Sequence, residues 1–255
     1  MILSIDVGNS SMVFGCIDGD SIRILDRIQT DPERSAKDYT KIIYELLKKG
    51  QIDPSLLEDA IISSVVPAVN AALKDALYLM CGKEPLFVEP DTKTGLIIEG
   101  DSSRQLGIDV IVGCAAAMEG YPLPLVVIDI GTASTISAVD RSRRYLGGMI
   151  LPGPRLLAQA LSSGTALLPE VRVEAPDSIL GQNTDERIKS GIIYGSAALI
   201  DGTLQRIEAL LGEKPTAVAT GGFAPLILPH CNSEVHYEEL LILEGLARIY
   251  RMNRP

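Results

Sequence analysis

The chain has 255 residues, of which 46% are hydrophobic, so it is long enough for two modest domains with real cores and too apolar for a disordered protein. Its formal net charge of -10 and pI of about 4.8 argue against a general binder of nucleic acids or anionic membranes. Four widely spaced cysteines and two histidines give no cluster of zinc-site spacing, and no apolar run is long enough to span a membrane.

In the first half of the chain, the apolar pattern over residues 2–28 predicts three strands, with turns near Asn9 and Gly19. The first strand begins almost at once and leaves no room for a signal peptide, so we expect a cytoplasmic protein. Further elements are predicted from capping residues and from glycine and proline: a helix from Ser35 or Asp38 to Gly50, a strand over 60–66, a helix from Pro67 to Gly82, a short strand over 86–88, a loop over 92–106 and a helix over 108–118.

Two prolines within residues 121–124 place the domain boundary there, which gives a first lobe over 1–121 and a second lobe over 122–255. Strands are predicted around Asp129 and over 145–148 and 217–220. Helices are predicted over 155–161, 183–211 and 239–250. In the long helix, Gly191 and Gly195 lie one turn apart, so we expect another backbone to pass close to them.

Residues 126–135 carry the motif around which the chain is organised. An apolar, β-branched run breaks at Asp129-Ile130-Gly131 into a turn rich in hydroxyl groups, and an apolar pattern then resumes. Asp6-Val7-Gly8 repeats the same order of strand, turn and strand at the start of the chain. Two such hairpins predict a duplicated α/β protein with a cleft between the halves, whereas one alone could be a polar hairpin of a β protein.

The turns have the chemistry of a phosphate site. A carboxylate at the end of a buried strand is costly unless a cation or hydrogen-bond donors meet it. Glycine permits close backbone approach, and the neighbouring hydroxyl and N–H groups suit a nucleotide phosphate and its cation. A ligand between the two turns would meet backbone donors from both sides.

Together with Thr220-Gly221-Gly222, these motifs resemble the actin-like ATPase and sugar-kinase superfamily, and within it the type III pantothenate kinases, nearly from end to end. The matching motifs, in the family's order, are Asp6-Val7-Gly8-Asn9-Ser10, Ser63-Ser64-Val65-Val66-Pro67, Gly107-Ile108-Asp109, Asp129-Ile130-Gly131-Thr132-Ala133, Gly147-Gly148, Pro152-Gly153, Thr165-Ala166 with Leu168-Pro169, Asn183-Thr184, Ser190-Gly191 and Tyr194-Gly195. Each motif is weak by itself, but the ordered set is strong.

The resemblance implies an α/β fold of two duplicated actin-like, ribonuclease H-like lobes with a nucleotide cleft between them. It also implies ATP-dependent phosphorylation of pantothenate to 4'-phosphopantothenate, the first step of coenzyme A biosynthesis. The implied cofactors are Mg²⁺ and a monovalent cation, potassium or ammonium. A homodimer with the acceptor pocket near the subunit contact is implied as well. We find no Walker-type GxxxxGK[ST] loop, in keeping with this family.

The resemblance also assigns roles to residues. Asp6 would face magnesium, Asn9 would donate to a phosphate oxygen, and Asp129 would bind the monovalent cation. Asp109 would be the general base for the attacking hydroxyl. The residues assigned to ATP are Asp6, Val7, Gly8, Asn9, Ser10, Ser11, Met12, Val13 and Thr132. The residues assigned to pantothenate are Gly107, Ile108, Asp109, Val110 and Thr184. Gly221-Gly222 would lie close to the adenosine.

The sequence departs from the family at the acceptor side. Val110 stands where the family has an arginine that would hold polar groups of pantothenate, and Arg104 could replace that charge from the preceding loop. Two alternatives therefore stay open: a kinase of another small hydroxyl acceptor, and a non-catalytic nucleotide-binding regulatory paralogue. Asp109 and Thr184 could also be helix caps only, and Gly221-Gly222 a plain strand-end turn.

Overall fold

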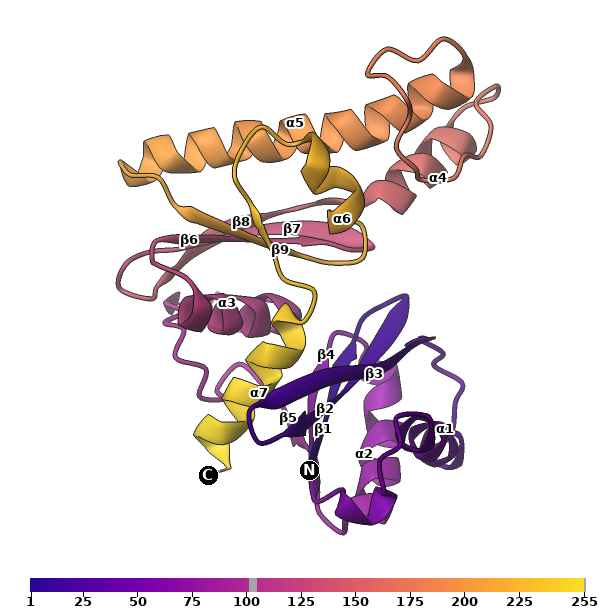
Figure 1. Cartoon of the computed structure of the whole chain (residues 1–255), viewed down its shortest axis with the longest axis vertical. Helices are drawn as coiled ribbons and strands as arrows, with labels where there is room; N and C mark the ends of the chain where they lie inside the picture. The colour runs from indigo at the N-terminus through magenta and orange to yellow at the C-terminus, as the bar shows by residue number, and fades with distance from the viewer. Residues whose placement is uncertain (101–104, 255) are drawn as a thin grey trace. The chain divides into compact units, whose positions relative to one another are not determined.

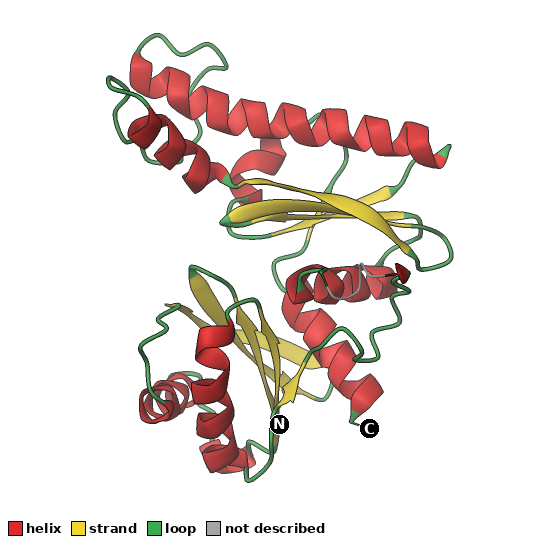
Figure 2. Ribbon diagram, turned by 180° about the vertical axis from the view of Figure 1, so that it is seen from behind, coloured by secondary structure: helices red, strands yellow, loops and turns green. Residues whose placement is uncertain are grey.

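The structure is a computed structural model that describes residues 1–100 and 105–254. The chain forms two units, and each is a β-sheet with helices packed against it (Figure 2). The first unit comprises Met1–Glu119 together with the C-terminal residues from Leu240 onward, and the second comprises Gly120–Glu239. No helix in the described part of the chain is long and apolar enough to cross a membrane.

The first unit is built on a five-stranded sheet in the order β3-β2-β1-β4-β5 (Figure 1). β2 is antiparallel to β1 and β3, whereas β4 is parallel to β1 and β5 is parallel to β4. The strands are β1 (Ile2–Val7), β2 (Ser11–Asp18), β3 (Ser21–Gln29), β4 (Asp59–Ser64) and β5 (Leu86–Phe87). The helices are α1 (Ala36–Lys49), η1 (Pro54–Leu56), α2 (Pro67–Cys81), α3 (Ile108–Gly120) and α7 (Leu241–Asn253).

Local chemistry explains where α1 and α2 begin and end. Ser35 caps α1 by accepting the Asp38 N–H, while the Asp38 carboxylate accepts the Ser35 N–H at 2.9 Å. Pro67 occupies the first turn of α2, where its missing N–H costs no hydrogen bond. Gly82 ends α2 in the left-handed conformation, with φ of 67°. The boundaries predicted for these helices are therefore confirmed to within a residue.

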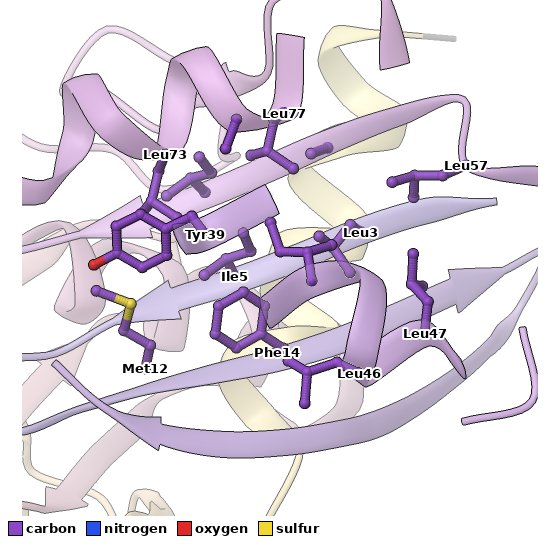
Figure 3. Close-up of a cluster of buried hydrophobic side chains, with 14 of the residues drawn as sticks. Leu3, Ile5, Met12, Phe14, Tyr39, Leu46, Leu47, Leu57, Leu73 and Leu77 are labelled. Carbon is purple, nitrogen blue, oxygen red and sulfur yellow. The ribbon is translucent and has the colours of Figure 1, made fainter. Parts of the chain in front are cut away.

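The two faces of the first sheet have separate cores. Leu3, Ile5 and Phe14 lie in a fully buried cluster with side chains of α1 and α2 (Figure 3). On the opposite face, Ile61 belongs to a second cluster to which α3 and α7 contribute. α7 comes so close to α3 that a Cβ at Gly245 would overlap the Val112 carbonyl oxygen.

The packing of α7 changes the predicted domain division. The prediction placed all of 122–255 in the second lobe, but residues from Leu240 onward pack in the first unit. The reason is that the apolar face of α7, including Leu243 and Leu246, completes the core over β1 and β4. The boundary near residue 121 agrees with the break after Glu119.

The second unit contains a sheet in the order β10-β9-β6-β7-β8. Its strands are β6 (Leu125–Ile130), β7 (Ala133–Val139), β8 (Tyr145–Pro152), β9 (Thr216–Thr220) and β10 (His236–Tyr237). Its helices are α4 (Pro154–Gly164), α5 (Thr184–Leu211), α6 (Ala224–Ile227) and η3 (Leu228–His230). Val126, Ile128 and Ile130 pack in one buried cluster with Ile192 and Ile200 of α5.

The two sheets match strand for strand, with β6 to β10 taking the places of β1 to β5. In both units the first three strands form an antiparallel meander, and the fourth and fifth strands join in parallel. Both sheets also have a register shift between their second and third strands. The predicted α/β protein of two duplicated lobes is therefore confirmed.

One packing prediction about α5 is wrong within this chain. A Cβ added at Gly191 or Gly195 would meet no atom within 4 Å, so no other backbone passes close to these glycines. Both positions lie on the exposed side of the helix, whereas Ile188, Ile192 and Leu204 are buried as the periodicity predicts. Small residues at helical spacing indicated a contact, but the core contacts lie on the other side of α5.

Candidate functional site

The Asp6 hairpin connects β1 to β2 through a short turn. Asp6 pairs with Val13 in the strand register, and the Gly8 N–H donates to the Ser11 carbonyl at 3.0 Å. A Cβ at Gly8 would lie 3.1 Å from that carbonyl oxygen, so the turn is tight at this point. Asn9 and Ser10 are exposed at its tip, where they can meet a ligand.

Thr30, at the end of β3, holds this turn. Its hydroxyl donates to the Gly8 carbonyl at 2.6 Å, and its N–H donates to the Ser10 carbonyl at 3.1 Å. Thr30 is nearly buried and was not singled out from the sequence, because nothing in its local pattern reveals that the third strand ends beside the first turn. The sequence therefore predicted the turn but not Thr30, whose hydrogen bonds hold it.

Not every side chain in the predicted phosphate segment faces the turn. Val7 and Met12 are buried in the core shared with α1 and α2, with 1% and 0% exposure. Their side chains face the core, so a contact of either residue with ATP would be made by its backbone groups. The polar side chains of this segment are Asp6, Asn9, Ser10 and Ser11, none of which is buried.

The Asp129 hairpin has the same plan with a turn that is one residue shorter. Asp129 pairs with Thr135, six positions later, whereas Asp6 pairs with a residue seven positions later. The Gly131 N–H donates to the Ala133 carbonyl at 3.2 Å. Thr132 is exposed at the tip, so this turn also presents a hydroxyl to a ligand.

Two glycines that are distant in sequence pack against the Asp129 turn. The Gly153 N–H donates to the Thr132 carbonyl at 3.0 Å, and a Cβ at Gly153 would overlap the carbonyl oxygens of Gly131 and Thr132. Gly221 has φ of 97°, and its Cβ would overlap the Asp129 carboxylate and lie 2.6 Å from the Ile130 nitrogen. Gly221-Gly222 is therefore a strand-end turn that lies directly against Asp129.

Asp109 lies in the first turn of α3 but is not its cap. The Ile111 N–H donates to the Gly107 carbonyl at 3.2 Å, so the helix begins from Gly107. The Asp109 carboxylate accepts the Val110 N–H at 2.9 Å and bends back over Gly107, where a Cβ would overlap it. Burial raises the pKa of Asp109, and backbone N–H groups oppose that rise.

The other predicted acceptor residues lie near helix starts. Ile108 and Val110 flank Asp109 and are half-buried. At the start of α5, Asn183 is the cap and accepts the Glu186 N–H at 3.0 Å, so Thr184 is not required as a cap and is exposed. Arg104 lies outside the described residues.

Neither carboxylate belongs to a ready-made metal cluster. Within residues 1–100 and 105–254, no three His, Cys, Asp or Glu side chains gather as metal ligands. Asp6 and Asp129 are each the next-to-last residue of a strand, beside glycine-containing turns with exposed polar residues. This arrangement suits a hard cation that takes further oxygen ligands from a bound phosphate and water.

Comparisons with known proteins agree over the whole chain. The family model described as type III pantothenate kinase matches residues 2–206. The type III pantothenate kinase of Exiguobacterium sp. is 38% identical over 254 residues, covering 100% of both chains. That of Geotalea daltonii is 37% identical over 254 residues, covering 100% of this chain and 99% of its own.

Solved structures show the same fold at low sequence identity. A putative Baf family transcriptional activator from Campylobacter jejuni aligns with a TM-score of 0.59 and 21% identity over 98% of both chains. An activator of 2-hydroxyisocaproyl-CoA dehydratase from Clostridium difficile, solved with bound ADPNP, aligns with a TM-score of 0.57 and 12% identity, covering 99% of this chain and 93% of that chain.

Proposed function

The chain belongs to the type III pantothenate kinase family, and we propose that it transfers the γ-phosphoryl group of ATP to pantothenate, giving 4'-phosphopantothenate in the first step of coenzyme A biosynthesis. The observation that carries this proposal is the pair of matching Asp-x-Gly turns, on equivalent strands of two duplicated units, in a chain with full-length kinase relatives. Phosphoryl transfer mainly requires positioning and charge neutralisation, which such turns provide.

The ATP phosphates are assigned to the two turns. Asn9 and Ser10 are exposed at the tip of the first turn and offer donors to phosphate oxygens. Thr132 is the equivalent exposed hydroxyl residue of the second turn. The duplication supports this assignment, since each unit carries one copy of the motif at the equivalent strand end.

The cations are assigned to the two aspartates. Asp6 is the next-to-last residue of β1 and is the residue for Mg²⁺, whose charge would offset that of the phosphates when ATP is bound. Asp129 is the residue for potassium or ammonium. Gly221 and Gly131 let backbone come close to its carboxylate, and the Ile130 carbonyl oxygen also lies beside Gly221.

Asp109 is the proposed general base. Its carboxylate accepts the proton of the 4'-hydroxyl of pantothenate as that oxygen attacks the γ-phosphorus. The Val110 N–H at 2.9 Å fixes the orientation of the carboxylate. Burial raises its pKa towards working pH, which makes the carboxylate a stronger proton acceptor. Gly107 is required because any side chain there would displace the carboxylate.

The acceptor side departs from the family, because the Val110 side chain has no hydrogen-bond donor to take the place of the family arginine. A kinase of another small hydroxyl compound is therefore the second candidate. A coupled ATPase assay with pantothenate and a panel of small hydroxy acids separates the two candidates, and we expect pantothenate to give the highest kcat/KM. Preference for another acceptor would establish the second candidate, and ATP binding without turnover on any acceptor would establish a regulatory protein.

Val110→Arg tests the acceptor pocket in the same assay. If no other group fills the role, the restored guanidinium should lower KM for pantothenate, since a charge-assisted hydrogen bond contributes about 1.5–3 kcal/mol. If Arg104 already fills it, two guanidinium groups would compete and KM should rise. Arg104→Ala measured alongside decides between these cases.

Family membership also implies a homodimer that works in the cytoplasm. We propose that the acceptor pocket lies near the subunit contact, and Thr184 is the residue assigned to pantothenate from α5. Sedimentation of the purified chain tests the dimer directly. A monomer with full kinase activity would contradict it.

A further inference from the structure

Two serines in the first sheet have buried hydroxyls with no hydrogen-bond partner. Within the described residues, Ser4 Oγ and Ser63 Oγ are the buried side-chain polar atoms left unpaired. Both residues are 0% exposed. An unpaired buried hydroxyl loses its hydrogen bonds to water without replacement, so a natural chain retains one only where something compensates.

Ser63 lies beside the proposed magnesium ligand. β4 runs parallel to β1, and Ser63 pairs in register with Asp6. Val7 and Ile62, which adjoin these two residues, point into the core under α1 and α2. Because side chains alternate along a strand, Asp6 and Ser63 lie on the opposite face of the sheet, next to each other at the carboxyl ends of their strands.

The second unit contains the same pair. Thr220 ends β9 and pairs in parallel register with Asp129, as Ser63 pairs with Asp6. Thr220 is also almost fully buried, at 4% exposure. A buried hydroxyl residue therefore stands beside the turn aspartate in both duplicated units, although the surrounding sequences differ.

We propose that Ser63 is a positioning residue for Asp6. With magnesium held at Asp6, the Ser63 hydroxyl would donate a hydrogen bond to the Asp6 carboxylate and fix its orientation. Outer hydrogen bonds of this kind tune metal ligands in many proteins. The inference rests on the proposed function, because it takes Asp6 as the magnesium residue of ATP binding.

Ser4 provides a matched control on the same face of the same sheet. It pairs with Gly15, where a Cβ would lie 2.7 Å from both Ser4 Oγ and the Leu243 Cδ1 atom. Ser4 is thus packed between a strand and α7, two residues before Asp6. A small side chain fits there for steric reasons, and its hydroxyl has no assigned role.

The test measures ATP binding to the full chain by calorimetry, with Mg²⁺ and with EDTA. Ser63→Ala should weaken binding of Mg-ATP about tenfold to a hundredfold, the range found when outer partners of metal ligands are removed. Binding in EDTA should not change. The melting temperature should stay the same or rise, because the substitution removes an unpaired buried hydroxyl. Ser4→Ala should have the same effect on the melting temperature and leave the affinity for ATP unchanged both with Mg²⁺ and with EDTA.

A double-mutant cycle sharpens the result. In Asp6→Asn, the further change Ser63→Ala should have little effect on Mg-ATP binding, because the two groups act as one unit. Equal weakening by Ser63→Ala with Mg²⁺ and EDTA, additive effects in the cycle, unchanged Mg-ATP affinity, or a marked fall in melting temperature would each overturn the proposal. Failure of the parent chain to bind ATP at all would instead overturn the proposed function.

Discussion

For Asp109, the sequence predicted the position of the carboxylate but not whether it caps the helix. The sequence placed a carboxylate at the start of a helix, where a cap and a catalytic base look alike. The structure shows that Asp109 is not the cap, since the helix begins from Gly107 and the carboxylate accepts the Val110 N–H. Burial, which decides the basicity of the carboxylate, depends on tertiary packing and could not be read from local sequence.

The first prediction concerns this base. Asp109→Asn keeps the shape of the side chain but cannot accept a proton, so kcat should fall about a hundredfold to ten-thousandfold if chemistry limits turnover. ATP affinity should persist. Asp75→Asn, the same change at an exposed position of α2, should leave kcat unchanged. A full kcat in Asp109→Asn would show that another group takes the proton.

The pH profile of the parent chain adds a second readout for Asp109. The proposed base accepts a proton only in its ionised form, so kcat/KM should rise with pH through the pKa of Asp109 and level off above it. Burial raises that pKa, so this limb should lie above the ordinary aspartate value of about 3.9. A limb at or below the ordinary value would contradict the assigned environment.

The second prediction concerns Asp129. Its carboxylate lies near the end of the mostly buried strand β6, with Gly221 packed against it, so a monovalent cation would offset the cost of its charge. Activity in sodium alone should be much lower than in potassium or ammonium at matched ionic strength. Equal rates in the three salts would contradict the assignment of a monovalent cation to Asp129.

At the scale of elements, the apolar periodicity and turn residues predicted nearly every strand and helix. The repeated Asp-x-Gly motif also predicted both hairpins. It did not reveal that the second turn is one residue shorter, since only the strand register fixes that. Thr30 and Gly153 were not recognised as parts of the turns, because each reaches its turn from a distant element.

Gly153 supplies the third prediction. A Cβ at this position would overlap backbone oxygens of the Asp129 turn, and backbone cannot move aside cheaply. Gly153→Ala should therefore lower the free energy of unfolding by about 1–3 kcal/mol. Gly164→Ala is the matched control, since its Cβ would enter open space at the end of α4. Denaturant unfolding of both variants checks this, and equal stability would mean that the turn adjusts without cost.

The fourth prediction concerns the last helix. Asp59 is buried at the start of β4 and accepts hydrogen bonds from the Tyr250 hydroxyl at 2.9 Å and from the Arg254 guanidinium. Tyr250→Phe should lower the free energy of unfolding by about 1.5–3 kcal/mol, the range for a hydrogen bond to a charged group. Tyr78→Phe on the exposed side of α2 should change it little. Equal effects of the two changes would show that this link does not hold α7 in place.

At the scale of the whole molecule, the duplication was predictable because each copy carries its own turn motif. The packing of α7 against the first unit could not be predicted, because the contacts that hold it join distant residues. Asp59 and Tyr250, for example, are 191 positions apart. The acceptor pocket is the least predictable part. Val110 departs from the family there, and Arg104 lies outside the described residues.

We propose that the protein consumes ATP to phosphorylate the 4'-hydroxyl of pantothenate. Mass spectrometry of the products, with ADP release followed in parallel, tests it most directly. We expect one 4'-phosphopantothenate for each ADP, and neither product when the 4'-hydroxyl of the acceptor is replaced by hydrogen. ADP release that continues unchanged without that hydroxyl, or ATP binding without a phosphorylated product, would contradict it.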